Sequence, residues 1–390
     1  MARVDEGERM TAHLRPTNQY AGVAAAGCAC GARISRRRIL ALGGSIAAAA
    51  ALSRTARAQS TVPALDTHAH YFPMAYLESI AERGGVGGFS VDLHAAAGPT
   101  LTGGGAVTVL DQSYWDLDRR LAAMDAAGVQ LHALSLTMPM PHLAEGERAA
   151  ELARTYNDAA AQAHGKHPDR FVGCIALPLN DVPRSIAELE RVGRQRAMRA
   201  VYAPTNIGGV ELSDPSLFPL FEKVESLGLP LMLHPHPAVV GLDRMRRFYL
   251  PNLLGNPFDT TLAVAHLVFG GVMDRFPALQ VLLPHAGGAF PYLYGRIQRG
   301  QQVIPDLKNV AERPVADYLT RFHYDTITHS PEALKYLVAL VGVDRVVLGS
   351  DYCFNMGDER PREIVGQLGI SPADRDRILF ANARRLLGLG

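Results

Sequence analysis

From residue 63 to the end of the chain, short apolar runs alternate with longer runs of helical period. The apolar runs, which we predict to be strands, cover residues 64–68, 131–136, 171–176, 200–204, 231–236, 281–285, 323–327 and 346–351. Strands that are apolar almost throughout are typical of parallel strands buried on both faces. Eight such repeats favour an α/β fold with a closed (β/α)₈ TIM barrel over an open doubly wound sheet. No glycine-rich phosphate loop follows the first strand, which disfavours a dinucleotide fold.

The runs of helical period lie between these strands. We predict helices over residues 115–127, 145–166, 181–195, 214–228, 258–276, 289–300, 331–342 and 372–387. Gly128 is a plausible C-cap for the first of them. The glycine-rich stretch 84–105 is expected to be a long loop or flap over the site. No linker or repeat divides the chain after residue 63, so residues 59–390 are predicted to form one domain.

The first 58 residues have the features of a cleavable signal peptide. Ser35 and three arginines, Arg36, Arg37 and Arg38, precede an apolar, alanine-rich run that ends in a small-x-small cleavage motif at 55–58. Paired arginines in front of such a core resemble the twin-arginine type of signal. We therefore expect the twin-arginine export machinery to carry the folded protein to the periplasm. The true start codon stays open between Met1 and Met10.

Charge and cysteine content exclude some classes of protein. The net charge of the 390 residues is +1, but residues 1–58 carry nine Arg against three acidic residues, which leaves −5 for the rest. A mildly acidic body lacks the basic face that nucleic-acid binding requires. Of the four cysteines, only Cys174 and Cys353 follow the signal, too few for a disulfide framework.

Histidine and aspartate residues fall at the predicted strand ends. His68 and His70 end the first strand, His234 and His285 end the fifth and sixth, and Asp351 ends the eighth. In a barrel the carboxyl ends of the strands converge on one mouth, where chemistry takes place. Three imidazoles and a carboxylate suit a divalent transition metal with an open position. A single buried histidine is more often structural than a ligand, but coincidence at several strand ends is improbable.

Several motifs make the chain resemble the amidohydrolase-related family of α-amino-β-carboxymuconate-ε-semialdehyde decarboxylase. They are Asp66-Thr67-His68-Ala69-His70 with Pro73, Leu233-His234-Pro235, His285-Ala286-Gly287-Gly288-Ala289-Phe290-Pro291, Gly295-Arg296-Ile297 and Leu348-Gly349-Ser350-Asp351-Tyr352. They occur in order over residues 63–390. The resemblance implies a TIM barrel of the metal-dependent hydrolase type, preceded here by the signal peptide.

The resemblance also implies roles for individual residues. His68, His70, His234 and Asp351 would bind one divalent metal ion, zinc with manganese as the alternative. His285 would be an unligated catalytic histidine, with Asp351 as the second catalytic group. Arg296 would lie near a substrate carboxylate, with a subunit interface as one location for it, which indicates a homodimer.

The sequence departs from the family pattern in two places. The family's namesake carries substrate-binding arginines before Trp115, but residues 107–114 contain no arginine. An arginine binds a carboxylate through two parallel hydrogen bonds, which the residues present here cannot do. We therefore do not expect this protein to act on the substrate of the family's namesake. His236 replaces an aromatic residue after Pro235 and could line the pocket, bind substrate or support the ligands.

These histidine and aspartate residues are compatible with more than one reaction. The first hypothesis is non-oxidative decarboxylation of an aromatic or unsaturated carboxylic acid. The second is hydrolysis or hydration of a lactone, an amide or an activated double bond by the same residues. A binding or scaffold protein on an inactive barrel is the third. Lesser candidates for the pocket wall or for ligand support are Tyr71, Phe72, His142, Asp325, His329 and Cys353.

Overall fold

The computed structural model describes residues 62–104, 106–235, 240–308 and 310–390. The predicted signal peptide, residues 1–58, and His236 lie outside the described residues. None of the helices in the described part of the chain combines the length and the apolar character needed to cross a membrane.

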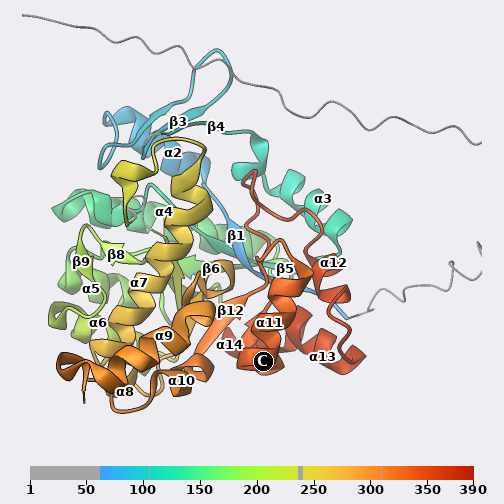
Figure 1. Cartoon of the computed structure of the whole chain (residues 1–390). Helices are drawn as coiled ribbons and strands as arrows, with labels where there is room; N and C mark the ends of the chain where they lie inside the picture. The colour runs from blue at the N-terminus through green and yellow to red at the C-terminus, as the bar shows by residue number, and fades with distance from the viewer. Residues whose placement is uncertain (1–61, 105, 236–239, 309) are drawn as a thin grey trace, which may run out of the picture. The chain divides into compact units, whose positions relative to one another are not determined.

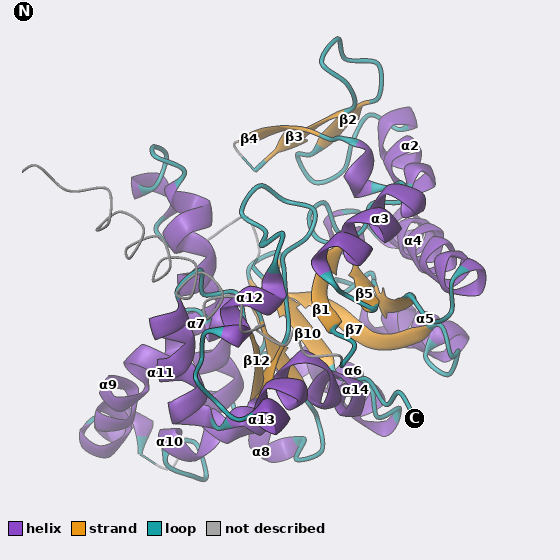
Figure 2. Cartoon of the chain, turned by 90° about the vertical axis from the view of Figure 1, so that its right-hand side faces the viewer, coloured by secondary structure: helices purple, strands orange, loops and turns teal. Residues whose placement is uncertain are grey.

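All eight predicted strands are present and form a single parallel sheet (Figures 1 and 2). In sheet order the strands are β1 (Leu65–His70), β5 (Leu131–Ser135), β6 (Phe171–Ile175), β7 (Met198–Pro204), β10 (Leu231–His234), β11 (Val281–Leu283), β12 (Phe322–Asp325) and β13 (Val346–Val347). The strands are parallel neighbours in the order of the sequence, each joined to the next by a crossover connection, as the (β/α)₈ topology requires.

Helices surround the sheet on its outer side (Figure 2). They are α2 (Met74–Glu82), α3 (Leu117–Ala127), α4 (Gly146–Lys166), α5 (Val182–Val192), α6 (Phe218–Ser226), α7 (Asn256–Phe269), α8 (Val272–Arg275), α9 (Phe290–Val303), α10 (Val315–Tyr318), α11 (Pro331–Val341), α12 (Pro361–Gly366), α13 (Pro372–Asp376) and α14 (Asn382–Leu386). The predicted C-cap Gly128 has φ 67°, a left-handed conformation that glycine adopts without strain. The predicted helix 372–387 is divided into α13, one π-helical turn and α14.

The expectation of a long irregular loop at 84–105 is wrong. This stretch contains β2 (Ser90–Asp92) and β3 (Thr100–Gly103), which pair with β4 (Ala106–Val109) in an antiparallel sheet. Val91 and Leu101 face each other across this sheet and are both buried. Their burial stabilises short strands whose glycine-rich flanks obscure the alternating pattern. A further pair, β8 (Asn206–Ile207) and β9 (Val210–Glu211), follows β7.

Backbone hydrogen bonds bring the first strand against the chain that follows the last one. Thr67 N donates to Leu348 O over 2.9 Å, and Asp351 N donates to His68 O over 2.8 Å. Ala69 and Tyr352 form a parallel bridge. The barrel interior is filled by apolar side chains from alternate strand positions, including Leu65, Val172 and Met232. Leu386 of α14 and Leu387, which follows it, pack against these interior side chains.

The turn before α9 allows a direct test of this packing. Gly288 has φ 62°, and a Cβ atom there would lie 2.1 Å from Pro257 O. We expect Gly288→Ala to lower the free energy of unfolding by at least about 2 kcal/mol, because the backbone must move. Gly295, inside α9 with no atom near its Cβ position, is the matched control. Gly295→Ala should raise stability by about 0.5–1 kcal/mol. Equal urea midpoints for the two variants would contradict this packing.

Candidate metal centre

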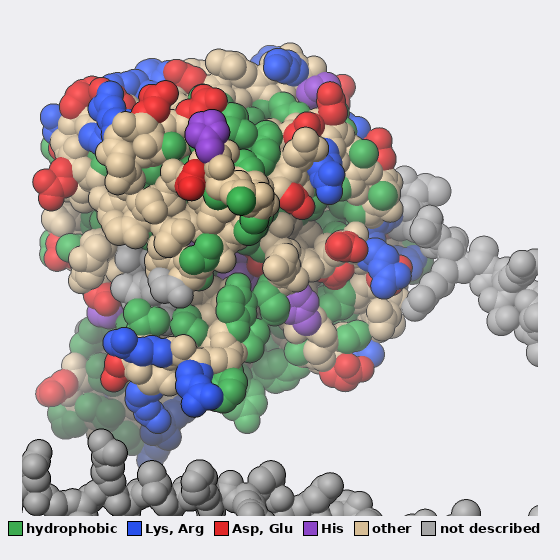
Figure 3. Space-filling model, turned by 90° about the horizontal axis from the view of Figure 1, so that it is seen from above, with side chains coloured by type: hydrophobic (Ala, Val, Ile, Leu, Met, Phe, Trp, Pro, Cys, Tyr) green, Lys and Arg blue, Asp and Glu red, His purple; other side chains and the backbone are tan. Residues whose placement is uncertain are grey.

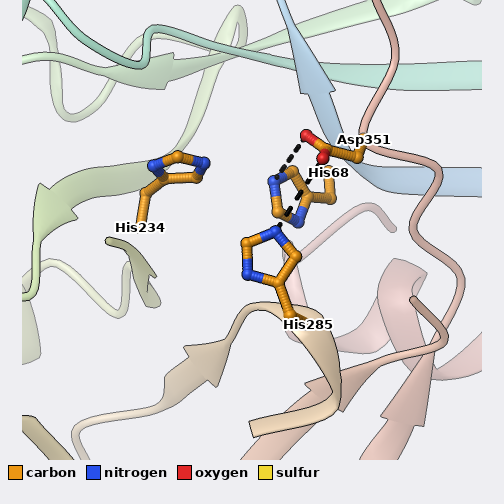
Figure 4. Close-up of side chains that lie close together, drawn as sticks. All are labelled: His68, His234, His285 and Asp351. Atoms are coloured by element: carbon orange, nitrogen blue, oxygen red, sulfur yellow. Dashed lines mark ion pairs between the residues drawn. The ribbon is translucent and has the colours of Figure 1, made fainter. Parts of the chain in front are cut away.

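The polar residues at the strand ends meet at one point of the barrel mouth. His68 lies on β1, His234 ends β10, His285 follows β11 and Asp351 follows β13. One ligand atom from each of the four lies within 4.8 Å of the others (Figure 4). This arrangement is a His/Asp metal site formed by residues far apart in the sequence.

His70 joins the same cluster. Its Nε2 lies 3.1 Å from His68 Nε2 and 2.9 Å from Asp351 Oδ1. His68 Nε2 lies 3.5 Å from the same Asp351 oxygen. The other oxygen of Asp351, Oδ2, is 3.8 Å from His285 Nε2. Asp351 therefore faces the two β1 histidines with one oxygen and His285 with the other.

Hydrogen bonds fix which nitrogen carries the proton in two of the ligand histidines, His68 and His234. His68 Nδ1 is 2.8 Å from Asp325 Oδ2, and His70 Nδ1 is 3.1 Å from Ser135 Oγ. His234 Nδ1 is 3.1 Å from the carbonyl of Pro235 and 2.9 Å from Thr137 Oγ1. A carboxylate and a carbonyl can only accept, so Nδ1 of His68 and of His234 is the donor. Their Nε2 lone pairs remain available to a metal.

The cluster fits a divalent cation. Nε2 of His68, Nε2 of His70 and Oδ1 of Asp351 lie within 3.5 Å of one another, so two imidazole nitrogens and one carboxylate oxygen converge on one point, as the ligands of a divalent cation do. Burial lowers the pKa of His70 to about 4 and holds that of His234 well below the usual value. Burial also acts to lower the pKa of His68, but the Asp325 hydrogen bond and the charge of Asp351 outweigh it and raise that pKa. A proton and a metal therefore compete for this position.

The carboxylates of the cluster are ionised. Burial acts to raise the pKa of Asp351, yet hydrogen bonds from His285 and His70 and the nearby imidazoles hold it well below its usual value. Asp325 is also lowered, since its bond to His68 outweighs burial. Ionised carboxylates are the form that binds a cation.

Asp325 connects His68 to the turn that carries His285. Its carboxylate accepts hydrogen bonds from the backbone N–H groups of His285 (2.9 Å) and Ala286 (2.8 Å). Both residues have positive φ, 50° and 57°, a costly conformation for non-glycine residues. Asp325 therefore stabilises this strained turn and orients a metal ligand at the same time.

A buried arginine lies behind the cluster. Arg120 of α3 is fully buried, and its guanidinium donates to the His70 carbonyl and lies 4.6 Å from the centre of the Tyr352 ring. It does not line the pocket, so it does not replace the arginines missing from residues 107–114. Asp66 accepts hydrogen bonds from His68 N and Ser350 N, and burial raises its pKa to about 6.

The structure brings together the predicted residues His68, His70, His234, His285 and Asp351, and their individual roles stay predictions. Arg296 is exposed on α9 and is not among the described residues that line the adjacent pocket, so its predicted contact with a substrate carboxylate stays a prediction. Among the lesser candidates, His329 lines the pocket and Asp325 supports His68. Burial raises the pKa of the Cys353 thiol to about 12, which fits a wall residue.

Sequence reasoning missed three supporting residues. Ser135 and Thr137 follow the apolar run of β5 two positions apart, and this polar strand end was the available signal. Arg120 lies on a helix, where an arginine is normally solvated, so the sequence offered no signal for its burial.

Comparisons with known proteins agree with this geometry. The Amidohydrolase family model matches residues 65–389. The 2-amino-3-carboxymuconate-6-semialdehyde decarboxylase of Dictyostelium discoideum is 36% identical over 83% of this chain and 91% of its own length. The gamma-resorcylate decarboxylase of Polaromonas sp. is 31% identical over 70% of this chain and 87% of its own.

A solved structure shares the fold. The dihydroxybenzoic acid decarboxylase of Polaromonas sp. JS666, described with bound manganese and 2-nitroresorcinol, superimposes with a TM-score of 0.70. It is 24% identical, and the match covers 84% of this chain and 98% of that one. The family match spans nearly the whole barrel and includes the five residues of the cluster. The chain therefore belongs to the amidohydrolase family.

Proposed function

We propose that this protein is a metal-dependent, non-oxidative decarboxylase of an aromatic or unsaturated carboxylic acid. One observation carries the proposal: Asp351 turns one carboxylate oxygen toward the predicted ligand histidines and the other toward His285. This arrangement supports a cation site at the histidines and, beside it, a proton-carrying pair formed by His285 and Asp351. The named activities of the two relatives, both decarboxylases, support the same reaction.

The residues of the chain have separate tasks in this reaction. The bond between the carboxylate carbon and the substrate carbon breaks, carbon dioxide leaves, and the carbon left behind takes up a proton. His285 Nε2 and Asp351 Oδ2, 3.8 Å apart, face each other where that proton must be held. An imidazole can exchange a proton near neutral pH, so we assign His285 as the proton carrier and Asp351 as its partner.

His68, His70, His234 and Asp351 are the residues that would hold the metal. A divalent ion there supplies Lewis-acid polarisation of a substrate oxygen. Zinc suits the nitrogen-rich donor set, and manganese is the alternative, supported by the ion in the Polaromonas structure. Arg296 would approach a substrate carboxylate from the neighbouring subunit of a homodimer.

A substrate screen tests the reaction. Metal-loaded protein is mixed with hydroxybenzoates, unsaturated diacids and lactones while carbon dioxide and acid release are both measured. Carbon dioxide from any acid supports the proposal. Acid release from a lactone without carbon dioxide would instead assign hydrolysis to the same residues.

His285→Asn should separate proton transfer from metal binding. The change keeps a polar, uncharged side chain but removes the exchangeable imidazole proton, so kcat should fall by about 10²–10⁴-fold. Metal content, measured by elemental analysis, should stay near one ion per chain. Loss of the metal would show that His285 is a ligand and would overturn the assigned roles.

Asp325→Asn should weaken metal binding. An amide cannot accept from His68 Nδ1, His285 N and Ala286 N together, so we expect affinity to fall by about 10–100-fold in chelator competition. Asp169→Asn, at an exposed position, is the control. Unchanged affinity in Asp325→Asn would mean that this carboxylate does not orient His68.

Export by the twin-arginine machinery to the periplasm is part of the proposal. Arg36→Lys combined with Arg37→Lys should leave the protein unprocessed in the cytoplasm, because this pathway requires the arginine pair. Fractionation and N-terminal sequencing, with Gln59 expected as the first mature residue, measure the result. The equally conservative pair Arg15→Lys and Arg33→Lys, which follows either start codon, is the control. Normal export of the first variant would remove the twin-arginine assignment.

A further inference from the structure

A pocket of about 400 Å³ opens beside the metal centre. His285 and Asp351 belong to its lining, so a molecule in this pocket lies against the proton-carrying pair. The face seen in Figure 3 is the one on which the barrel mouth opens, and hydrophobic side chains gather near its centre. Tyr292 and Tyr336 supply aromatic walls. Such a lining suits a flat, largely apolar ligand.

The charge of the lining is unusual for a site that takes a carboxylic acid. Among the described residues that line this pocket, none is a lysine or an arginine. The described residues of this lining therefore offer no fixed positive charge to hold a second carboxylate.

Two neutral amides occupy the wall instead. Asn252 lies in the π-helical turn Pro251–Gly255, and Asn256 is the first residue of α7. They are four residues apart on continuous helix, so both face the same side. Neither side-chain amide makes a hydrogen bond to another described residue. Each amide can donate to and accept from a ligand.

We propose that this pocket selects acids with a single carboxylate and neutral hydroxyl-type substituents, and that Asn252 and Asn256 are the residues that recognise those substituents. The inference rests on the proposed decarboxylation, because the one carboxylate is the group that is lost at His285 and Asp351. The inference restricts the substrate to acids with one carboxylate. It does so within a family whose named relatives include a decarboxylase of a carboxymuconate semialdehyde.

The physical reason is desolvation. A second carboxylate inside the pocket loses water and meets no lysine or arginine among the described lining residues, and an unpaired ion in such a place is costly. A hydroxyl group loses less on desolvation, and a hydrogen bond to an amide offsets the loss. Selectivity therefore follows from the neutral wall as well as from its two amides.

Three matched acids test the inference. The parent is 2-hydroxybenzoate, and 2,4-dihydroxybenzoate and 2-hydroxyterephthalate add a hydroxyl or a carboxylate at the same ring position. Calorimetric binding to the metal-loaded protein is measured separately from carbon dioxide release. We expect the dihydroxy acid to bind at least about tenfold more tightly than the diacid.

Variants connect the preference to the amides. Asn256→Arg should shift the ratio toward the diacid by about tenfold or more, because it adds the missing cation. Gln195→Arg, exposed just ahead of β7 and hence at the opposite end of the barrel, is the control for the added charge. Asn252→Ala combined with Asn256→Ala should remove the advantage of the dihydroxy acid over the parent.

The outcomes separate the two proposals. Tighter binding of the diacid to the unaltered protein, or no effect of Asn256→Arg, overturns the specificity inference while carbon dioxide release still supports the reaction. If Arg296→Gln then abolishes a diacid preference, the partner subunit supplies the cation. Absence of carbon dioxide from every acid overturns the proposed reaction, and the binding ratios still decide the inference.

Discussion

The backbone ladder between β1 and residues 348–352 is the constraint on which the site depends. The bond from Asp351 N to His68 O joins the first strand to the end of the barrel. The same bond places the Asp351 carboxylate beside His68 and His70, so barrel closure and assembly of the cluster are one event. Asp66 adds to the junction by accepting from Ser350 N. The metal centre therefore forms only when the whole barrel is in place.

Support for the cluster comes from neighbouring strands. Asp325 on β12 orients His68, Ser135 at the end of β5 orients His70, and Thr137 just beyond β5 contacts His234. Each partner contacts Nδ1 and leaves Nε2 toward the centre. Because strands of a barrel are held in fixed register, these partners position the imidazoles more rigidly than loop residues would. The orientation of these histidines therefore depends on the register of the barrel strands.

Much of the fold and the cluster follows from local sequence pattern. Apolar runs predicted all eight barrel strands, and histidines at their ends predicted the metal centre. The small sheet of β2–β4 was missed because its buried residues, Val91 and Leu101, are separated by glycine-rich sequence. Strand β13 is shorter than its apolar run because the chain beyond Val347 pairs with β1 instead. Burial of Arg120 depends on long-range contacts with Tyr352 and His70, which no local pattern encodes.

The charges of the centre explain why its pocket can be neutral. Asp351 and Asp325 are ionised and buried, and a bound divalent cation would balance those two negative charges. The guanidinium of Arg120, which donates to the His70 carbonyl, is a buried positive charge behind the cluster. A second carboxylate on the substrate would meet no lysine or arginine among the described residues that line the pocket. Amide side chains at Asn252 and Asn256 are therefore the electrostatically consistent way to recognise the remote end of the substrate.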